Sequence, residues 1–124
     1  MKKLKILLIE DTPDVLEGLL ELLEMEGYEM AGATNGKDAL EKLQTFTPHL
    51  IITDLRMPEM DGFTFLRNVK SNPVHNTIPV LVFSANATPE NEDKSLHLGA
   101  AGFLKKPCNT DRLLEHIQTL LHHR

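Results

Sequence analysis

A chain of 124 residues with a formal net charge of −5 fits one domain, which buries about two thirds of the surface its unfolded chain exposes. No run of Lys or Arg is longer than two residues, so this acidic chain is not expected to bind nucleic acid directly. One cysteine excludes an intramolecular disulfide, and no apolar stretch approaches the roughly 20 residues of a membrane-spanning helix; we therefore expect a cytoplasmic protein without membrane insertion.

Five strand-like runs alternate with five helix-like segments along the chain. The strand-like runs lie at residues 5–9, 28–32, 50–53, 78–83 and 101–104. The run at 28–32 alternates apolar with polar or small residues, which is typical of a less buried strand at a sheet edge. The alternation of strands and helices predicts a single α/β domain, with a parallel sheet covered by helices on both faces.

Capping residues indicate where the helices begin. Thr12 and Pro13 suit the start of the first helix, and Thr88 and Pro89 repeat that signal at the fourth. Asn109 is expected to cap the last helix. The other helices are expected to begin near Asn35-Gly36 and near Asp61-Gly62, and the first and third to end at Gly27 and at Ser71 before Pro73.

Apolar residues at helical spacing predict which helix faces pack on the sheet. In the first, second, third and fifth helices they are Val15, Leu16, Leu19, Leu20, Leu22 and Leu23; Ala39, Leu40, Leu43 and Phe46; Phe63, Leu66 and Val69; and Leu113, Leu114, Ile117, Leu120 and Leu121. The fourth helix has only Leu96 and Leu98 as large apolar residues. Because short helices depend on packing, we expect the fourth helix to be the most mobile one.

Polar side chains follow the buried strands at the point where each strand ends. Glu10 and Asp11 follow the first strand, Asp54 the third and Ser84 the fourth, and Lys106 comes shortly after the fifth. The carboxyl ends of parallel strands meet at one edge of the sheet, where clustered carboxylates favour a cation such as Mg²⁺. With that charge neutralised, Asp54 can act as a nucleophile toward phosphorus while Ser84 and Lys106 hold the phosphoryl oxygens.

In this order the motifs resemble the receiver domain of two-component response regulators, the CheY-like family. The resemblance rests on Glu10-Asp11, on Asp54 followed by Met57-Pro58-Glu59-Met60-Asp61-Gly62, on Ser84-Ala85, and on Phe103 three residues before Lys106-Pro107. It covers essentially residues 1–124. The strand pattern likewise looks like the flavodoxin-like fold, a doubly wound five-stranded parallel sheet of order 2-1-3-4-5 with five helices.

The resemblance implies a role for each of these positions. Asp11 and Asp54 are expected to ligate Mg²⁺, with Glu10 acting partly through water and the backbone carbonyl of Arg56 completing the protein ligands. Asp54 is the expected phosphoacceptor, and Lys106 the lysine that pairs with the phosphoryl group.

The remaining expectations concern switching and tuning of the phosphorylated state. A cis peptide bond is implied between Lys106 and Pro107. Ser84 is expected to move toward the phosphoryl group, and Phe103 to turn inward into the space that Ser84 vacates. Arg56 and Asn86, two residues beyond Asp54 and Ser84, are expected to tune how readily water attacks the phosphoryl group.

The implied function is a phosphorylation-controlled switch rather than an enzyme with an external substrate. The partners would be a sensor histidine kinase or histidine phosphotransfer protein, and a downstream protein target that binds the fourth helix, fifth strand and fifth helix of a monomer or weak dimer. Met1 and a complete fifth helix favour a stand-alone regulator. The alternatives are a receiver fragment of a larger regulator or hybrid kinase, and a pseudo-receiver scaffold that is not phosphorylated.

Two other classes fit the sequence less well. A phosphatase of the haloacid dehalogenase type needs a second aspartate two residues after its nucleophile, where this chain has Arg56. A flavodoxin-like cofactor binder needs a phosphate-cradling Gly- or Ser-rich loop after the first strand, where Glu10 and Asp11 would repel phosphate.

Overall fold

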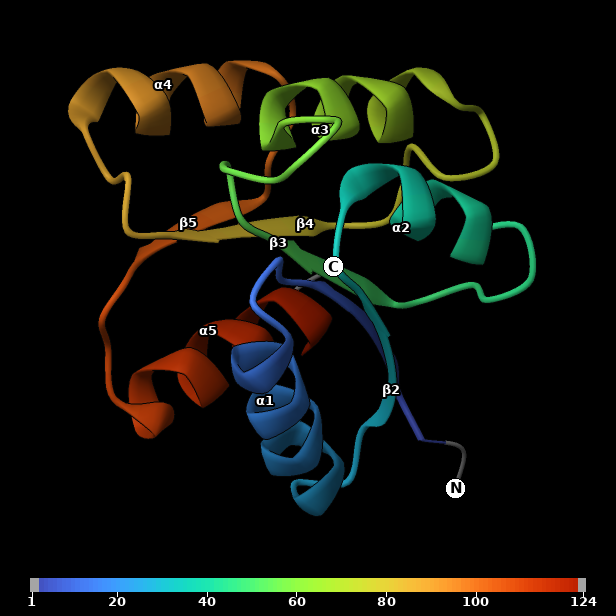
Figure 1. The fold of residues 1–124 in the computed structure, drawn as a ribbon, viewed down its shortest axis with the longest axis vertical. Helices are drawn as coiled ribbons and strands as arrows, with labels where there is room; N and C mark the ends of the chain where they lie inside the picture. Colours follow the sequence, from blue (N-terminus) through green and yellow to red (C-terminus); the bar gives the residue numbers. More distant parts are fainter. Residues whose placement is uncertain (1–2, 123–124) are drawn as a thin grey trace.

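The computed structural model describes residues 3–122, which form one five-stranded parallel sheet with five helices (Figure 1). The strand order β2-β1-β3-β4-β5 confirms the predicted fold class. In chain order the elements are β1 (Lys5–Ile9), α1 (Pro13–Met25), β2 (Glu29–Ala33), α2 (Gly36–Lys42), β3 (Leu50–Thr53), α3 (Gly62–Ser71), β4 (Val80–Ser84), α4 (Pro89–His97), β5 (Gly102–Lys105) and α5 (Thr110–His122). None of the helices within this range has the length and apolarity needed to cross a lipid bilayer.

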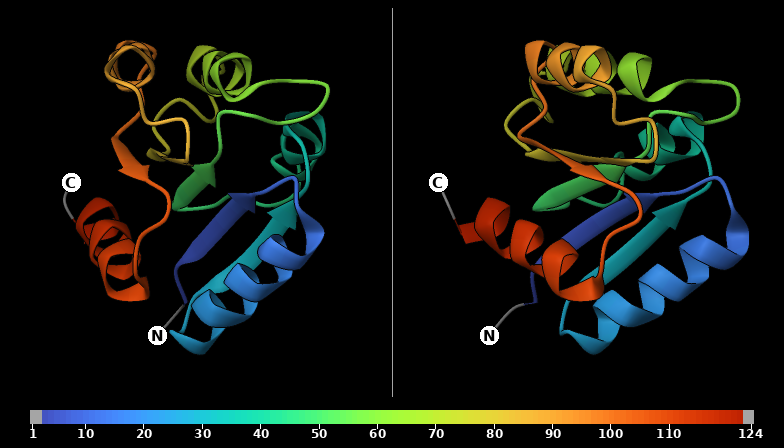
Figure 2. Two further views of the ribbon diagram at one scale, coloured as in Figure 1. Left: turned by 60° about the vertical axis from the view of Figure 1, so that its left-hand side comes forward. Right: turned by 90° about the vertical axis from the view of Figure 1, so that its left-hand side faces the viewer.

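Helices cover both faces of the sheet, with α1 and α5 on one side and α2, α3 and α4 on the other (Figures 1 and 2). Each face has its own core, because successive side chains of a strand point to opposite faces. In β1, Ile6 and Leu8 pack in the core under α1 and α5, and Leu7 and Ile9 pack in the core under α2 and α3. The central strands β1, β3 and β4 are almost completely buried, whereas β2 and β5 are the partly exposed edges.

The register of the central strands brings the polar residues after them together. Ile9 pairs with Thr53, so Glu10 and Asp54 leave the sheet as neighbours. Thr53 pairs with Val82, and Ser84 at the end of β4 pairs with Lys105. The carboxyl ends of four strands therefore meet at one edge, as the sequence predicts.

Side-chain caps confirm the expected starts of four helices. The backbone N–H groups of Asp38, Thr64 and Asn91 donate to the side chains of Asn35, Asp61 and Thr88 at 2.7, 2.8 and 3.2 Å. Asn109 accepts likewise from the N–H of Arg112, at 2.8 Å. Thr12 precedes α1 in extended conformation, but its side chain makes no cap hydrogen bond. Its backbone N–H donates to Glu10 Oε2 at 3.1 Å.

Two predicted apolar faces need correction. In α3, Leu66 and Val69 are buried as expected, but the fully buried aromatic side chain is Phe65. Phe63 is only half-buried and lies beneath the Lys94 ammonium, which is 4.2 Å from its ring centroid. The buried stripe runs through 62, 65, 66 and 69, so spacing by three alone selected the wrong phenylalanine. In α1, Val15 is exposed.

The fourth helix buries little of its surface, as predicted. Ser95 is its only buried residue among those described, and Leu96 remains 45% exposed. Leu98 packs against the core from just beyond the end of the helix. The greater mobility expected for α4 stays a prediction.

Candidate functional site

Lys106 joins the ends of β1 and β3. Its Nζ lies 2.7 Å from Glu10 Oε1 and 3.1 Å from Asp54 Oδ2. The backbone N–H of Lys106 donates to the Ser84 carbonyl at 3.0 Å, which ties the segment after β5 to the end of β4. The peptide bond between Lys106 and Pro107 is cis, as the sequence implies. Four of the five predicted site positions are therefore directly linked.

The ion pairs set the protonation of these groups. Burial by itself would raise the pKa of Glu10, which is 4% exposed, but hydrogen bonds from Lys106 and the Thr12 N–H outweigh it, so the pKa is lowered. Burial would lower the pKa of Lys106, yet its contacts with Glu10 and Asp54 raise it. Both partners are therefore charged at neutral pH.

Asp54 is held by main-chain donors on its other oxygen. Its Oδ1 accepts hydrogen bonds from the N–H groups of Leu55 at 2.6 Å and Arg56 at 3.4 Å. The following loop returns close to Asp54, because the Gly62 N–H donates to the Leu55 carbonyl at 2.8 Å. A Cβ at position 62 would collide with the backbone carbonyl oxygen of Asp54, so this approach requires glycine.

The negative charges of Glu10, Asp11 and Asp54 favour binding of a divalent cation. Burial raises the pKa of Asp11, and a hydrogen bond with Glu10 and the negative charges of Glu10 and Asp54 raise it further. A cation bound at Asp11 would relieve the repulsion between its carboxylate and those of Glu10 and Asp54. Within residues 3–122 no group of three or more His, Cys, Asp or Glu side chains is placed to hold a metal ion by itself. This donor set still fits Mg²⁺, which binds through one or two carboxylates and retains water.

Ser84 is 1% exposed at the end of β4, and its Oγ accepts a hydrogen bond from the Asn86 N–H at 3.1 Å. Its hydroxyl is thus placed at the same sheet edge as Asp54, between the strands that carry Asp54 and Lys106. Phe103 is half-buried on β5 and lines a surface groove of about 430 Å³ between α4 and α5. The inward turn of Phe103, expected when Ser84 moves toward a phosphoryl group, stays a prediction.

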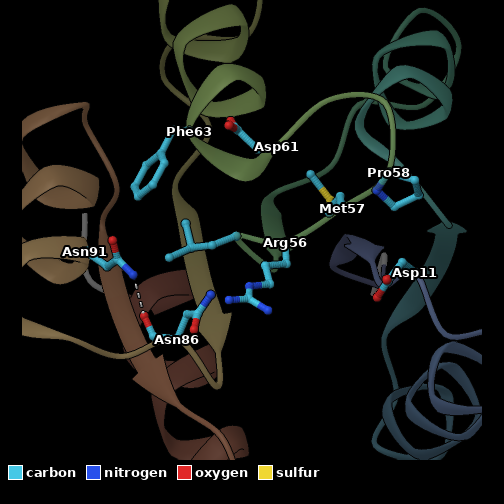
Figure 3. Close-up of a pocket in the computed structure, with 9 residues that line it drawn as sticks. Asp11, Arg56, Met57, Pro58, Asp61, Phe63, Asn86 and Asn91 are labelled. Carbon is cyan, nitrogen blue, oxygen red and sulfur yellow. Dashed lines mark hydrogen bonds between the residues drawn. The ribbon is translucent and has the colours of Figure 1, made fainter.

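A second groove, of about 610 Å³, is lined by Leu55 and Arg56, which follow Asp54 in the chain, and reaches Asn91 of α4 (Figure 3). Arg56 and Asn86, the two predicted tuning residues, both line it, as does Asp11. Asn91 of α4 also lines this groove and donates from its Nδ2 to the Asn86 carbonyl at 3.0 Å. The sequence analysis did not identify Asn91, because the sequence does not show that its amide reaches the Asn86 carbonyl.

Comparisons with known proteins agree with this geometry. The family model described as response regulator receiver domain matches residues 6–118. A gliding motility regulatory protein of Myxococcus xanthus is 37% identical over 105 residues, which are 85% of this chain and 14% of that protein. This chain thus spans only a small part of that relative.

Two solved structures share the fold over nearly the whole chain. The signal receiver domain of a signal transduction histidine kinase from Syntrophus aciditrophicus is 39% identical, with a TM-score of 0.86 over 94% of this chain and 89% of that one. The chemotaxis response regulator CheY4 of Vibrio cholerae is 32% identical, with a TM-score of 0.90 over 97% of this chain and 100% of that one.

Proposed function

We propose that this chain, which belongs to the response regulator receiver domain family, uses Asp54 as its phosphoacceptor. The proposed phosphodonor is a phosphorylated histidine of a partner protein. A sensor histidine kinase or a histidine phosphotransfer protein is the partner proposed. The observation that carries the proposal is the pairing of Asp54 with Lys106, whose Nζ lies 3.1 Å from Asp54 Oδ2 and 2.7 Å from Glu10 Oε1.

In the proposed reaction an Asp54 carboxylate oxygen attacks phosphorus, and the bond from phosphorus to the donor imidazole nitrogen breaks. The imidazole leaves with the bonding electron pair, so no redox partner is needed. Two main-chain N–H groups hold Oδ1 in place, which orients Oδ2. The Lys106 ammonium neutralises negative charge on the phosphoryl oxygens, and the Ser84 hydroxyl donates to one of them.

A bound Mg²⁺ would neutralise further charge on the phosphoryl oxygens. Asp11 and Asp54 are the proposed side-chain ligands, with the Arg56 carbonyl beside them and Glu10 acting partly through water. The raised pKa of Asp11, caused by burial and then by Glu10 and Asp54, supports a cation requirement.

The output is proposed to be a change at the face formed by α4, β5 and α5. An acyl phosphate at Asp54 adds negative charge and acceptor oxygens that Ser84 and Lys106 can contact, which biases an existing equilibrium of the protein. The groove on this face, lined by Leu96, Phe103 and Leu120, is the proposed contact for a downstream protein. Turnover of an external substrate is not part of the proposal, and the protein is proposed to act as a monomer or weak dimer.

The proposal is tested by incubating the protein with Mg²⁺ and a small acyl-phosphate donor, followed by intact-mass measurement. The expected result is the added mass of one phosphoryl group. Acid treatment should remove this mass, and chelation of Mg²⁺ before the reaction should prevent it from appearing. Asp54→Asn should take up no label, whereas Asp61→Asn, a nearby exposed carboxylate that caps α3, should be labelled normally. Equal labelling of Asp54→Asn would reject the assignment, and an unlabelled wild type would favour the scaffold alternative.

A further inference from the structure

Asn91 hydrogen-bonds both to the loop between β4 and α4 and to residues of α4 itself. Its Nδ2 donates to the Asn86 carbonyl at 3.0 Å, across the loop between β4 and α4 (Figure 3). Its backbone N–H donates to Thr88 Oγ1 at 3.2 Å, and its carbonyl accepts from Ser95 Oγ at 2.8 Å. The side-chain amide of Asn91 therefore ties the loop to the first turn of α4, and its backbone groups bond within the helix.

The loop end of this connection reaches Ser84. The N–H of Asn86 donates to Ser84 Oγ at 3.1 Å, while the carbonyl of the same residue accepts from Asn91. The Asn86 backbone is thus held on one side by the hydroxyl proposed to contact the phosphoryl group, and on the other side by α4.

On the α4 side, Asn91 is bonded to a residue in the protein interior. Ser95 is fully buried, and it holds the Asn91 carbonyl one turn away. The rest of α4 has little apolar support, since Leu96 is 45% exposed and Lys94 lies over the Phe63 ring of α3 rather than in a core. A helix held by so few contacts can follow a displacement of its first turn.

We propose that Asn91 is a positioning residue that couples the Ser84 hydroxyl to the first turn of α4. The proposal rests on the phosphoacceptor function proposed above. When the Ser84 side chain rotates so that its Oγ moves toward a phosphoryl oxygen, the hydrogen bond that Oγ accepts from the Asn86 N–H is displaced. The amide of Asn91 passes that change to α4, so that loop and helix shift together. The groove that both asparagines line leaves space on this side for the shift.

Asn91→Ala removes the amide, and Asn91→Asp keeps the shape but loses the donor. Asn68→Ala is the matched control, because Asn68 Nδ2 also donates to a backbone carbonyl, that of Thr64 at 3.0 Å, on the exposed side of α3. Backbone amide hydrogen exchange is measured first without a phosphodonor. Both Asn91 variants should speed exchange at Asn86 and Glu92 on the order of fivefold, as expected for one lost hydrogen bond, while Asn68→Ala leaves them unchanged.

The second arm compares amide chemical shifts before and after phosphorylation. In wild type and Asn68→Ala the shifts should extend from Ser84 through residues 91–95. In both Asn91 variants they should stop at Asn86, with labelling of Asp54 retained. Shifts that reach α4 equally in Asn91→Ala would overturn the coupling, as would wild-type exchange rates in Asn91→Asp. A wild-type protein that takes up no phosphoryl group would reject the phosphoacceptor function instead. The hydrogen-exchange measurement made without a phosphodonor would still decide whether Asn91 holds the loop.

Discussion

The Nζ of Lys106 lies 2.7 Å from Oε1 of Glu10, a residue 96 positions away in the chain. The same ammonium also contacts Asp54, so Lys106 forms ion pairs with two carboxylates. One of them, Glu10, is almost fully buried. The contact joins the first strand to the segment after the last, and the stability of the folded sheet should therefore depend on it.

Lys106→Met is expected to lower the free energy of unfolding by about 1–3 kcal/mol, because it leaves a buried carboxylate without its partner. The expected loss of stability is smaller than for a fully buried ion pair, because the side chains of Lys106 and Asp54 retain some contact with solvent. Urea unfolding at neutral pH measures the change. Lys105→Met, an exposed neighbour, should alter stability by less than about 0.5 kcal/mol. Equal effects at both positions would show that the ion pairs add nothing.

Gly62→Ala is expected to destabilise the protein by about 1–3 kcal/mol, because the new Cβ meets the backbone of Asp54 and Leu55 rather than a movable side chain. The displaced loop should also slow phosphorylation of Asp54. Gly18→Ala is the matched control: nothing lies within 4 Å of a Cβ there, and the position is inside α1. That change should instead stabilise the protein by about 0.5–1 kcal/mol in thermal or urea unfolding. A neutral Gly62→Ala would mean that the loop can yield.

The sheet and its polar edge were predictable because local patterns specify them. Buried β-branched runs ending in Glu10, Asp54 and Ser84 define parallel strands and their carboxyl ends, and the register then places these residues together. The amide of Asn91 was not predictable, since an asparagine in a first helical turn does not show which carbonyl it will reach. Phe63 and Phe65 differ by two positions, and only the way α3 docks on the sheet decides which one is buried.

Acidic pH should weaken the start of α3 through Asp61. The backbone N–H of Thr64 holds the pKa of Asp61 below its ordinary value, with further help from the Thr64 side chain and from Lys94 and Arg67. A lowered pKa in the folded state adds stability that is complete above the unfolded pKa and is lost as pH falls through the folded one. Asp61→Ala should cost about 1 kcal/mol at neutral pH. Urea unfolding at neutral and strongly acidic pH should show the difference from wild type shrink on acidification; a constant difference would mean that the charge is irrelevant.

Amide hydrogen exchange should be faster in α4 than in α5 of the unphosphorylated protein. The fifth helix packs Leu113, Ile117 and Leu121 in the core, whereas α4 buries only Ser95 among its described residues. Since most helical stability in proteins comes from packing, the opening of α4 should cost less free energy than global unfolding, while the centre of α5 should exchange near the global limit. Exchange measured residue by residue in native buffer compares the two. Ser95→Ala removes the buried hydroxyl that holds Asn91 and should speed exchange in α4 alone. Equal protection of the two helices would show that the few polar contacts of α4 stabilise it as well as a core does, and the proposed role of α4 as a movable element would then fail.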